Sequence, residues 1–243
     1  MTKILYKNEL EVKFRIENEK AKKEYANKLL QQGFVLSDNH LETDFTFDTA
    51  DDLCKKNEII LRYRIIGNNE DYLLTMKMKQ KNNEFQDHIE IECSESDYDF
   101  LEKLNEINRI LKEVINKSIP RINPKSESLL EIISRVQEGG FVKNRMLSQK
   151  ERVKYTKDEM SVCFDTLPQD LGEYIELEAF DDKKLFFLID YLSPNINLLE
   201  KRNYGKLIQD LLQERLVDLA YRRICVFDSE LGREVRLKFG LMQ

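Results

Sequence analysis

Apolar and charged residues alternate in the segment NELEVKF at residues 8–14. Successive side chains of a strand point to opposite faces, so this pattern predicts a strand with one wholly apolar face, which suits a core. The other face would carry two carboxylates and an ammonium group, from Glu9, Glu11 and Lys13. Such a row of charges is either exposed to solvent or lines a binding site.

The same alternation recurs along the chain. It predicts further strands at 59–65, 72–79, 87–93, around 141–155, 160–165 and 173–180, and an extended segment over FVLSDNHLETDFTFDT at 34–49. Apolar residues at helical spacing predict a helix that ends at Gly33, two helices within 94–138, one over 185–192 and one from Tyr204 to about Tyr221. The segment after the extended stretch, DTADDLCKKNE, is typical of a polar loop.

The order of these elements indicates an α+β fold. No low-complexity linker divides the chain, so we expect a single domain over residues 1–212, with a helical insertion at about 94–138. Residues 213–243 form a C-terminal extension that is rich in apolar side chains. Alternation of Val235, Leu237 and Phe239 would fit a hairpin, and a partner-binding segment is the alternative.

Composition and charge exclude several protein classes. Hydrophobic residues make up 41% of the 243 residues, charged residues 35%, and the formal net charge is −6. A net acidic surface is poorly suited to nucleic acid. We find no apolar stretch long enough for a signal peptide or a membrane span. The four cysteines are far apart and form no C-x-x-C pair, which indicates reduced thiols in a cytoplasmic protein.

The charged faces of the predicted strands are sorted by sign. Basic pairs lie on three of them, as Arg62 and Arg64, Lys77 and Lys79, and Lys150 and Arg152. Acidic pairs lie on two others, as Glu90 and Glu92, and Glu176 and Glu178. For any one strand, a solvated face is the better explanation. For the set, the sorting favours two matched subsites, a carboxylate cluster for a hard cation and an Arg/Lys cluster for a polyanion.

If the sheet closes into a barrel, both clusters face one interior. Many like charges in a dry interior would be intolerable, but a wet tunnel that binds a metal and phosphates brings the missing counter-charges. On this hypothesis Glu9 and Glu11 face a metal and Lys13 faces phosphate.

An ordered series of short motifs accompanies this pattern. E-x-E-x-K comes first, at residues 9–13, and the others follow as Asp44-Phe-Thr-Phe47-Asp48, Leu61-Arg62-Tyr-Arg64, Leu74-Thr75-Met-Lys77, Ile89-Glu90-Ile-Glu92, Lys150-Glu-Arg152-Val-Lys-Tyr155, Asp165, Leu171-Gly172-Glu-Tyr174-Ile-Glu176-Leu-Glu178 and Arg202-Asn203-Tyr204. The series resembles the CYTH superfamily, the triphosphate tunnel metalloenzymes, and within it the class IV adenylyl cyclase-like branch. It spans roughly residues 8–212.

The resemblance implies a closed eight-stranded antiparallel β-barrel tunnel with helices packed outside, a divalent metal, Mg²⁺ or Mn²⁺, and a small-molecule substrate with a triphosphate group. It implies a metal end formed by Glu9, Glu11, Glu176 and Glu178, with Glu90, Glu92 and Asp165 in support. It implies phosphate binding by Lys13, Arg62, Arg64, Lys77, Lys79, Lys150 and Arg152. Glu9, Glu11, Lys13 and Lys77 would serve phosphoryl transfer, which needs mainly positioning and charge neutralisation.

The chain departs from the family pattern at several points. Lys3-Ile4 stand where cyclases of the enterobacterial type carry His-Phe, and Asn203 replaces the serine of an R-S-Y element. The helical region 94–138 is longer than usual, and residues 213–243 lie beyond the usual end. We hypothesise that these two additions form a joint surface that supports a homodimer.

Three functions remain open. The first is a metal-dependent triphosphatase for inorganic, nucleoside or thiamine triphosphate, and the second is an adenylyl cyclase in the same tunnel. The third is a non-catalytic phosphate or nucleotide sensor, which the complete acidic set disfavours. The missing His-Phe favours hydrolysis over cyclisation. We expect no catalytic role for His88, on a strand, or for His40, in a polar loop.

Overall fold

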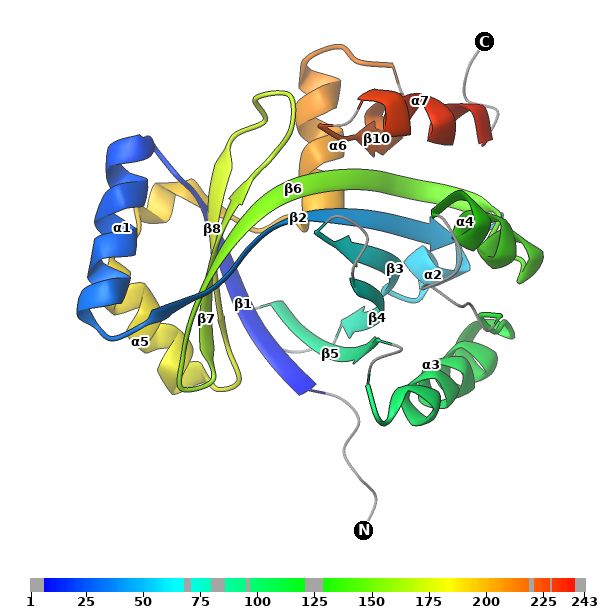
Figure 1. Cartoon of the computed structure of the whole chain (residues 1–243), viewed down its shortest axis with the longest axis horizontal. Helices are drawn as coiled ribbons and strands as arrows, with labels where there is room; N and C mark the ends of the chain where they lie inside the picture. The colour runs from blue at the N-terminus through cyan, green and yellow to red at the C-terminus, as the bar shows by residue number, and fades with distance from the viewer. Residues whose placement is uncertain are drawn as a thin grey trace.

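The computed structural model describes residues 7–67, 71–79, 86–94, 97–120, 129–218, 221–227 and 229–238. A curled sheet forms a half-barrel with helices around it (Figure 1). Its long strands are β1 Lys7–Arg15, β2 Val35–Asp48, β3 Ile59–Ile66, β4 Asp71–Lys79, β5 Gln86–Cys93, β6 Lys143–Lys157, β7 Met160–Thr166 and β8 Glu173–Ala179. Two short strands extend the sheet: β9 Leu199–Glu200 pairs with β1, and β10 Ile224–Cys225 pairs with β6.

The long strands run antiparallel in the order β6-β2-β3-β4-β5-β1-β8-β7. β6 pairs with β2 along most of its length, and its segment 151–157 also pairs with β7. The α+β class and the curled antiparallel sheet that the sequence predicts are confirmed. The closed eight-stranded barrel remains a proposal.

Helices α1 Glu19–Gln31 and α5 Asp182–Leu192 cover the apolar face of β1, β7 and β8 (Figure 1). Each begins at an acceptor side chain, because Asn18 and Asp181 accept hydrogen bonds from the backbone N–H groups of the first turn. Leu29 of α1 and Leu188 of α5 are buried in one cluster with Phe14 of β1. This cluster fixes the direction in which the opposite face of β1 points.

Helices α3 Phe100–Ile115 and α4 Leu129–Glu138 cover the apolar face of β3, β4 and β5. Ile107 and Ile133 are fully buried against Leu61 and Met76. The insertion therefore supplies the core on this side of the sheet. Helix α3 ends at Ile115, and residues 121–128, before α4, lie outside the described residues.

Asp48 at the end of β2 shapes the connection to β3. Its buried carboxylate accepts hydrogen bonds from the backbone N–H groups of Thr49, Cys54 and Lys55. These bonds order a short helix, α2 Leu53–Lys56, where the sequence suggested only a polar loop. The motif carboxylate at Asp48 is thus explained by local structure.

Helix α6 Tyr204–Glu214 closes one end of the sheet, preceded by the 3₁₀ turn η1 Ile196–Leu198. Leu207, Ile208 and Leu212 of α6 are buried against Met146 and Tyr174. The helix is shorter than expected, because Leu216 adopts a left-handed conformation with φ of 61° just beyond its end.

The C-terminal extension is folded onto the domain. It contains the 3₁₀ turn η2 Tyr221–Arg223, β10 and helix α7 Ser229–Lys238, so the hairpin interpretation is wrong. Ile224 and Val235 lie in the same apolar cluster as α3 and α4. The extension and the insertion therefore share a core within one chain, whereas a homodimer through them remains a prediction.

Two further expectations concern thiols and membranes. All four cysteines are free and buried, and that they are reduced thiols in the cell remains a prediction. Among the described helices, none has the length and apolar character that spanning a bilayer requires.

The packing of the extension predicts that it contributes to stability. Ile224→Ala should lower the free energy of unfolding by about 2–5 kcal/mol, because it removes buried methyl groups from a packed cluster. Leu237→Ala, at an exposed position of α7, should change it by less than about 0.5 kcal/mol. Urea unfolding monitored by circular dichroism measures both values, and equal effects would mean that the extension is not docked.

Candidate active site

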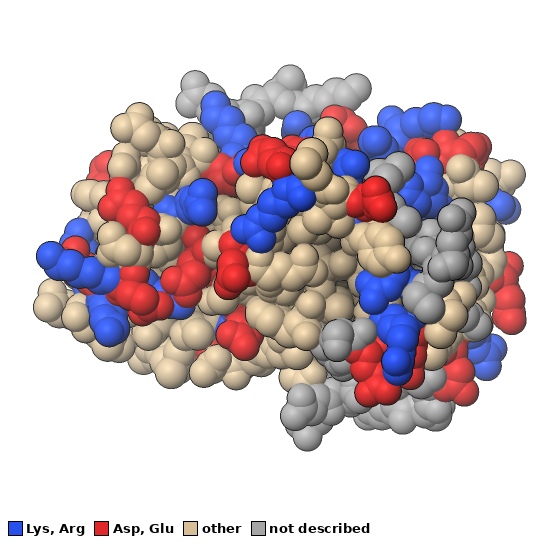
Figure 2. Space-filling model, turned by 90° about the horizontal axis from the view of Figure 1, so that it is seen from above, with Lys and Arg blue, Asp and Glu red and all other residues tan. Residues whose placement is uncertain are grey.

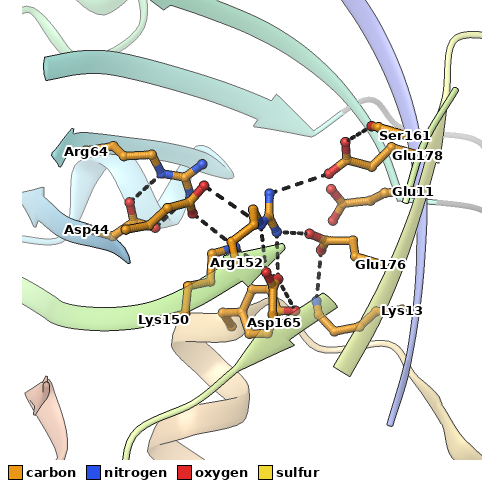
Figure 3. A network of polar contacts seen from close by, with 12 residues as sticks. Glu11, Lys13, Asp44, Arg64, Lys150, Arg152, Ser161, Asp165, Glu176 and Glu178 are labelled. Atoms are coloured by element: carbon orange, nitrogen blue, oxygen red, sulfur yellow. Dashed lines mark hydrogen bonds and ion pairs between the residues drawn. The ribbon is translucent and has the colours of Figure 1, made fainter. Parts of the chain in front are cut away.

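Charged side chains from most of the long strands are buried on the inner face of the sheet. They share low exposure to solvent and come from β1, β2, β3, β5, β6, β7 and β8: Glu11, Lys13, Glu42, Arg64, Glu90, Lys150, Arg152, Asp165, Glu176 and Glu178. The sheet therefore has an apolar outer face under the helices and a charged inner face, as the alternation predicts. Figure 3 shows many of these side chains converging from opposite strands.

Arg152 is at the centre of the network (Figure 3). Its Nε and Nη2 atoms donate to the two carboxylate oxygens of Asp165 at 2.7 and 2.6 Å. Nη2 also donates to Glu176 at 2.5 Å, and Nη1 lies 3.8 Å from Glu178. β6 thus sends one guanidinium group between β7 and β8, in the forked geometry that suits carboxylates.

Two lysines lie against one aromatic ring beside this centre. Lys13 Nζ is 4.0 Å and Lys150 Nζ 4.5 Å from the ring centroid of Tyr204. The Tyr204 hydroxyl donates to Asp165 at 2.5 Å, and Lys13 Nζ lies 3.4 Å from Glu176. The first residue of α6 therefore forms part of the site through its ring and its hydroxyl.

Two further arginines, both on β3, extend the network. Arg64 donates to both oxygens of Asp44 at 2.7 and 2.9 Å. Arg62 Nη1 lies 3.4 Å from Asp44 and its Nη2 3.6 Å from Glu90. Lys77 Nζ continues the network, 3.0 Å from Glu90 and 3.8 Å from Glu11. The contacts therefore form one chain of charges across the inner face.

Glu11 and Glu178 are direct cross-strand partners on β1 and β8. Like charges opposite each other destabilise a sheet, so a cation near both carboxylates would offset the repulsion. Carboxylate oxygens are the donors that Mg²⁺ and Mn²⁺ prefer, so this pair offers two groups of the right chemistry for such an ion. Among the described residues, however, no group of three His, Cys, Asp or Glu side chains is arranged to hold a metal.

Neighbouring cations keep the buried carboxylates ionised. Burial raises the pKa of Glu42, but Arg152, Arg64 and Lys150 together lower it well below its usual range. In the same way, Lys13 and Arg152 outweigh burial and lower the pKa of Glu176. Burial opposes the charge of Arg152, yet Asp165 raises the pKa of that guanidinium. The interior is therefore a charged network at neutral pH.

The network contains more carboxylates than cations. Among the described residues, six cationic side chains meet eight carboxylates: Lys13, Arg62, Arg64, Lys77, Lys150 and Arg152 against Glu11, Glu42, Asp44, Glu90, Glu92, Asp165, Glu176 and Glu178. The molecular surface seen from above in Figure 2 carries lysine, arginine, aspartate and glutamate intermixed with uncharged residues.

Most of the residues that the sequence singled out lie in this network. Lys79 is exposed at the end of β4, and the side chain of Glu92 is 45% exposed, with Thr75 and Arg62 as contacts. Glu9 lies on β1 and His88 on β5, but their side chains are outside the described part of the chain.

Sequence reasoning missed four members of the network. Glu42 and His40 lie on the inward-facing side of β2, so the placement of His40 in a polar loop is wrong. Asp44 and Tyr204 stood in motifs without an assigned role. The strand parity of residues 40, 42 and 44 was the available signal for three of them. Tyr204 reaches the site from a helix, which no strand pattern could indicate.

Comparisons with known proteins agree with this architecture. Residues 7–186 match the family model described as CYTH domain, which is most of the chain, so the chain belongs to this family. No curated protein matches the sequence.

Three solved structures have a similar fold. A candidate adenylate cyclase from Vibrio parahaemolyticus is 16% identical, with a TM-score of 0.56, over 83% of this chain and 97% of its own. A conserved hypothetical protein from Pyrococcus furiosus is 18% identical, with a TM-score of 0.53, over 82% and 99%. A candidate adenylyl cyclase from Hippeastrum, described as having a dominant triphosphatase activity, is 17% identical, with a TM-score of 0.51, over 83% and 95%. At these identities the likeness shows the fold alone.

The network predicts that stability falls in acid. Arg64 and Arg62 outweigh burial and lower the pKa of Asp44 from 3.8 to about 2. Its stabilising contribution, about 2 kcal/mol, is therefore present above pH 4 and lost as the pH falls towards 2. Asp44→Asn should lower the free energy of unfolding at pH 7, and its difference from the wild type should shrink between pH 4 and pH 2.5.

Urea unfolding at several pH values checks this prediction. Asp158→Asn, a change at an exposed turn between β6 and β7, is the control and should follow the wild type throughout. A difference for Asp44→Asn that stays constant from pH 7 to pH 2.5 would contradict the assigned ion pair.

Proposed function

We propose that this CYTH-domain protein is a divalent-metal-dependent phosphohydrolase that binds a triphosphate substrate inside a closed tunnel formed by the eight long strands. The observation that carries the proposal is the inner face itself, where buried arginines and lysines lie beside buried carboxylates. A structural core gains nothing from such a set, because each buried charge must be desolvated and balanced. A polyanion with its metal ion uses both signs.

The charge balance supports a metal requirement. The described lining has two more carboxylates than cations, and a triphosphate adds several negative charges to it. An added cation would therefore strengthen binding. Mg²⁺ or Mn²⁺ would be held by Glu11 and Glu178. The E-x-E-x-K motif implies Glu9 as a further ligand. When bound, the ion neutralises phosphate charge and polarises the phosphorus–oxygen bonds.

The protein's own cations would bind and orient the phosphates. Arg62 and Arg152 offer forked donors. Lys13 and Lys150, from two different strands, offer ammonium groups that lie over the ring of Tyr204. Lys77 lies between Glu11 and Glu90, beside the proposed metal ligands, where it can donate to a phosphate oxygen. Phosphoryl transfer needs this positioning and charge neutralisation more than covalent chemistry.

An adenylyl cyclase is the alternative, and the name of the Vibrio relative supports it. The described triphosphatase activity of the Hippeastrum protein supports hydrolysis. The two reactions would use the same residues and differ in the phosphorus atom that is attacked. Incubation with ATP and with tripolyphosphate, each with Mg²⁺ or Mn²⁺, followed by ³¹P NMR distinguishes them. Hydrolysis yields orthophosphate, whereas cyclisation yields cyclic AMP and pyrophosphate.

The metal assignment predicts the effect of removing one carboxylate. Glu11→Gln and Glu178→Gln should each lower kcat with tripolyphosphate at least about a hundredfold, because they weaken the site that neutralises phosphate charge. Glu234→Gln makes the same chemical change at an exposed position of α7 and should leave kcat unchanged. Full activity of either inner variant at low Mg²⁺ would remove that residue from the metal site.

The phosphate assignment predicts different effects on tripolyphosphate binding for Arg62 and Lys79, which lie on the adjacent strands β3 and β4. Arg62→Ala should weaken tripolyphosphate binding by about ten- to a hundredfold, the usual effect of losing a charge-assisted hydrogen bond. Lys79→Ala should leave binding unchanged, because Lys79 is exposed. Isothermal titration calorimetry measures both. Equal weakening would mean that the phosphates extend to the outer end of β4.

A further inference from the structure

Glu42 lies among three of the proposed phosphate-binding cations. Its Oε2 atom is 3.1 Å from Arg64 Nη2 on β3 and 3.2 Å from Lys150 Nζ on β6. Its Oε1 atom is 3.8 Å from Arg152 Nε, also on β6. The side chain is buried, with 4% exposure. One carboxylate from β2 thus occupies the space on which cations of two neighbouring strands converge.

The contacts of Glu42 differ from those of the other carboxylates in this region. Asp165 accepts two hydrogen bonds from Arg152, and Asp44 accepts two from Arg64, all between 2.6 and 2.9 Å. Among the side chains that the structure describes, the buried Glu42 Oε2 atom has no partner in hydrogen-bonding geometry, although Arg64 and Lys150 lie nearby. Arg64 and Arg152 would therefore keep a strong carboxylate partner if Glu42 moved away.

An alternative partner for Glu42 is already in contact. His40, two residues earlier on the same face of β2, has its Nε2 atom 3.2 Å from Glu42 Oε1. Its Nδ1 atom lies 2.9 Å from the carboxylate of Asp38. On the neighbouring strand β6, Arg152 pairs with His40, and Lys154 pairs with Asp38. The hydrogen bond to Glu42 outweighs burial and raises the pKa of His40. The imidazole can thus carry a positive charge beside Glu42.

We propose that Glu42 is an exchangeable counter-ion, which holds the place of a phosphate group among Arg64, Lys150 and Arg152 and gives it up to the substrate. On binding, phosphate oxygens replace the carboxylate of Glu42 at the three cations. The displaced charge of Glu42 is then balanced by protonated His40. Glu42 is thereby a specificity-determining residue, because only an anion with enough charge to displace a carboxylate gains access to these cations.

This inference rests on the proposed polyanion site, and it predicts an unusual direction of change. Glu42→Gln keeps the shape of the side chain and removes its charge. It should bind tripolyphosphate about tenfold more tightly in metal-free buffer, because no negative charge competes for the cations. Glu151→Gln is the matched control, since Glu151 lies between Lys150 and Arg152 in the sequence but is exposed on the other face of β6. It should bind like the wild type.

Calorimetry of the full-length proteins gives four informative results. Tighter binding by Glu42→Gln than by Glu151→Gln supports the exchange. Unchanged or weaker binding overturns it and makes Glu42 a structural or ligand-holding residue. If neither the wild type nor Glu42→Gln binds tripolyphosphate, both this inference and the proposed function are wrong. Tighter binding without any hydrolysis in Mg²⁺ or Mn²⁺ supports the exchange and overturns the hydrolase.

A second measurement tests the proposal on the wild type, so that it does not depend on correct folding of the variant. The chain has two histidines, so the ring signals of His40 and His88 can be followed by two-dimensional NMR. Tripolyphosphate should move the pH midpoint of His40 upward, and the movement should be smaller in Glu42→Gln. A midpoint that does not move in the wild type, or that moves equally in both proteins, would overturn the transfer of charge towards His40.

Discussion

The structure depends on the mutual neutralisation of charges that a curled sheet encloses. Arg152 illustrates the constraint. It donates hydrogen bonds to Asp165 and Glu176 and lies within 3.8 Å of Glu42 and Glu178. These four carboxylates come from three strands, β2, β7 and β8. Removing Arg152 would leave buried carboxylates without their partner, which costs about 3–5 kcal/mol. The register of β2, β6, β7 and β8 is therefore tied to the position of one guanidinium group.

The outer face of the sheet supplies the stability that this interior does not. Two apolar clusters lie under α1 and α5 on one side and under α3 and α4 on the other, and β10 and α7 complete the second. A third cluster anchors α6, which brings the ring of Tyr204 beneath Lys13 and Lys150. The segments beyond residue 186, where the family match ends, thus contribute both to the core and to the site.

Sequence reasoning succeeded where a repeating pattern had one physical meaning. Alternation on β1, β3 and β8 separated inner from outer residues, because a strand has a period of two. It failed for Val235 and Leu237, since a few alternating apolar residues also fit a helix such as α7. It missed Glu42 because β2 mixes charged and polar residues, and its pairing with β6 is visible only in space. The position of Tyr204 depends on the docking of α6, which no local pattern encodes.

The central claim is that the interior binds a metal ion and a polyanion together. The metal ion balances the surplus of carboxylates in the described lining, and the polyanion binds the arginines and lysines. A crystal grown with Mn²⁺ and tripolyphosphate tests it directly, because Mn²⁺ gives an anomalous X-ray signal. The account predicts an anomalous peak between Glu11 and Glu178, and phosphate density among Arg62, Lys150 and Arg152. Phosphate density outside the sheet, or an anomalous peak away from these two carboxylates, would contradict it.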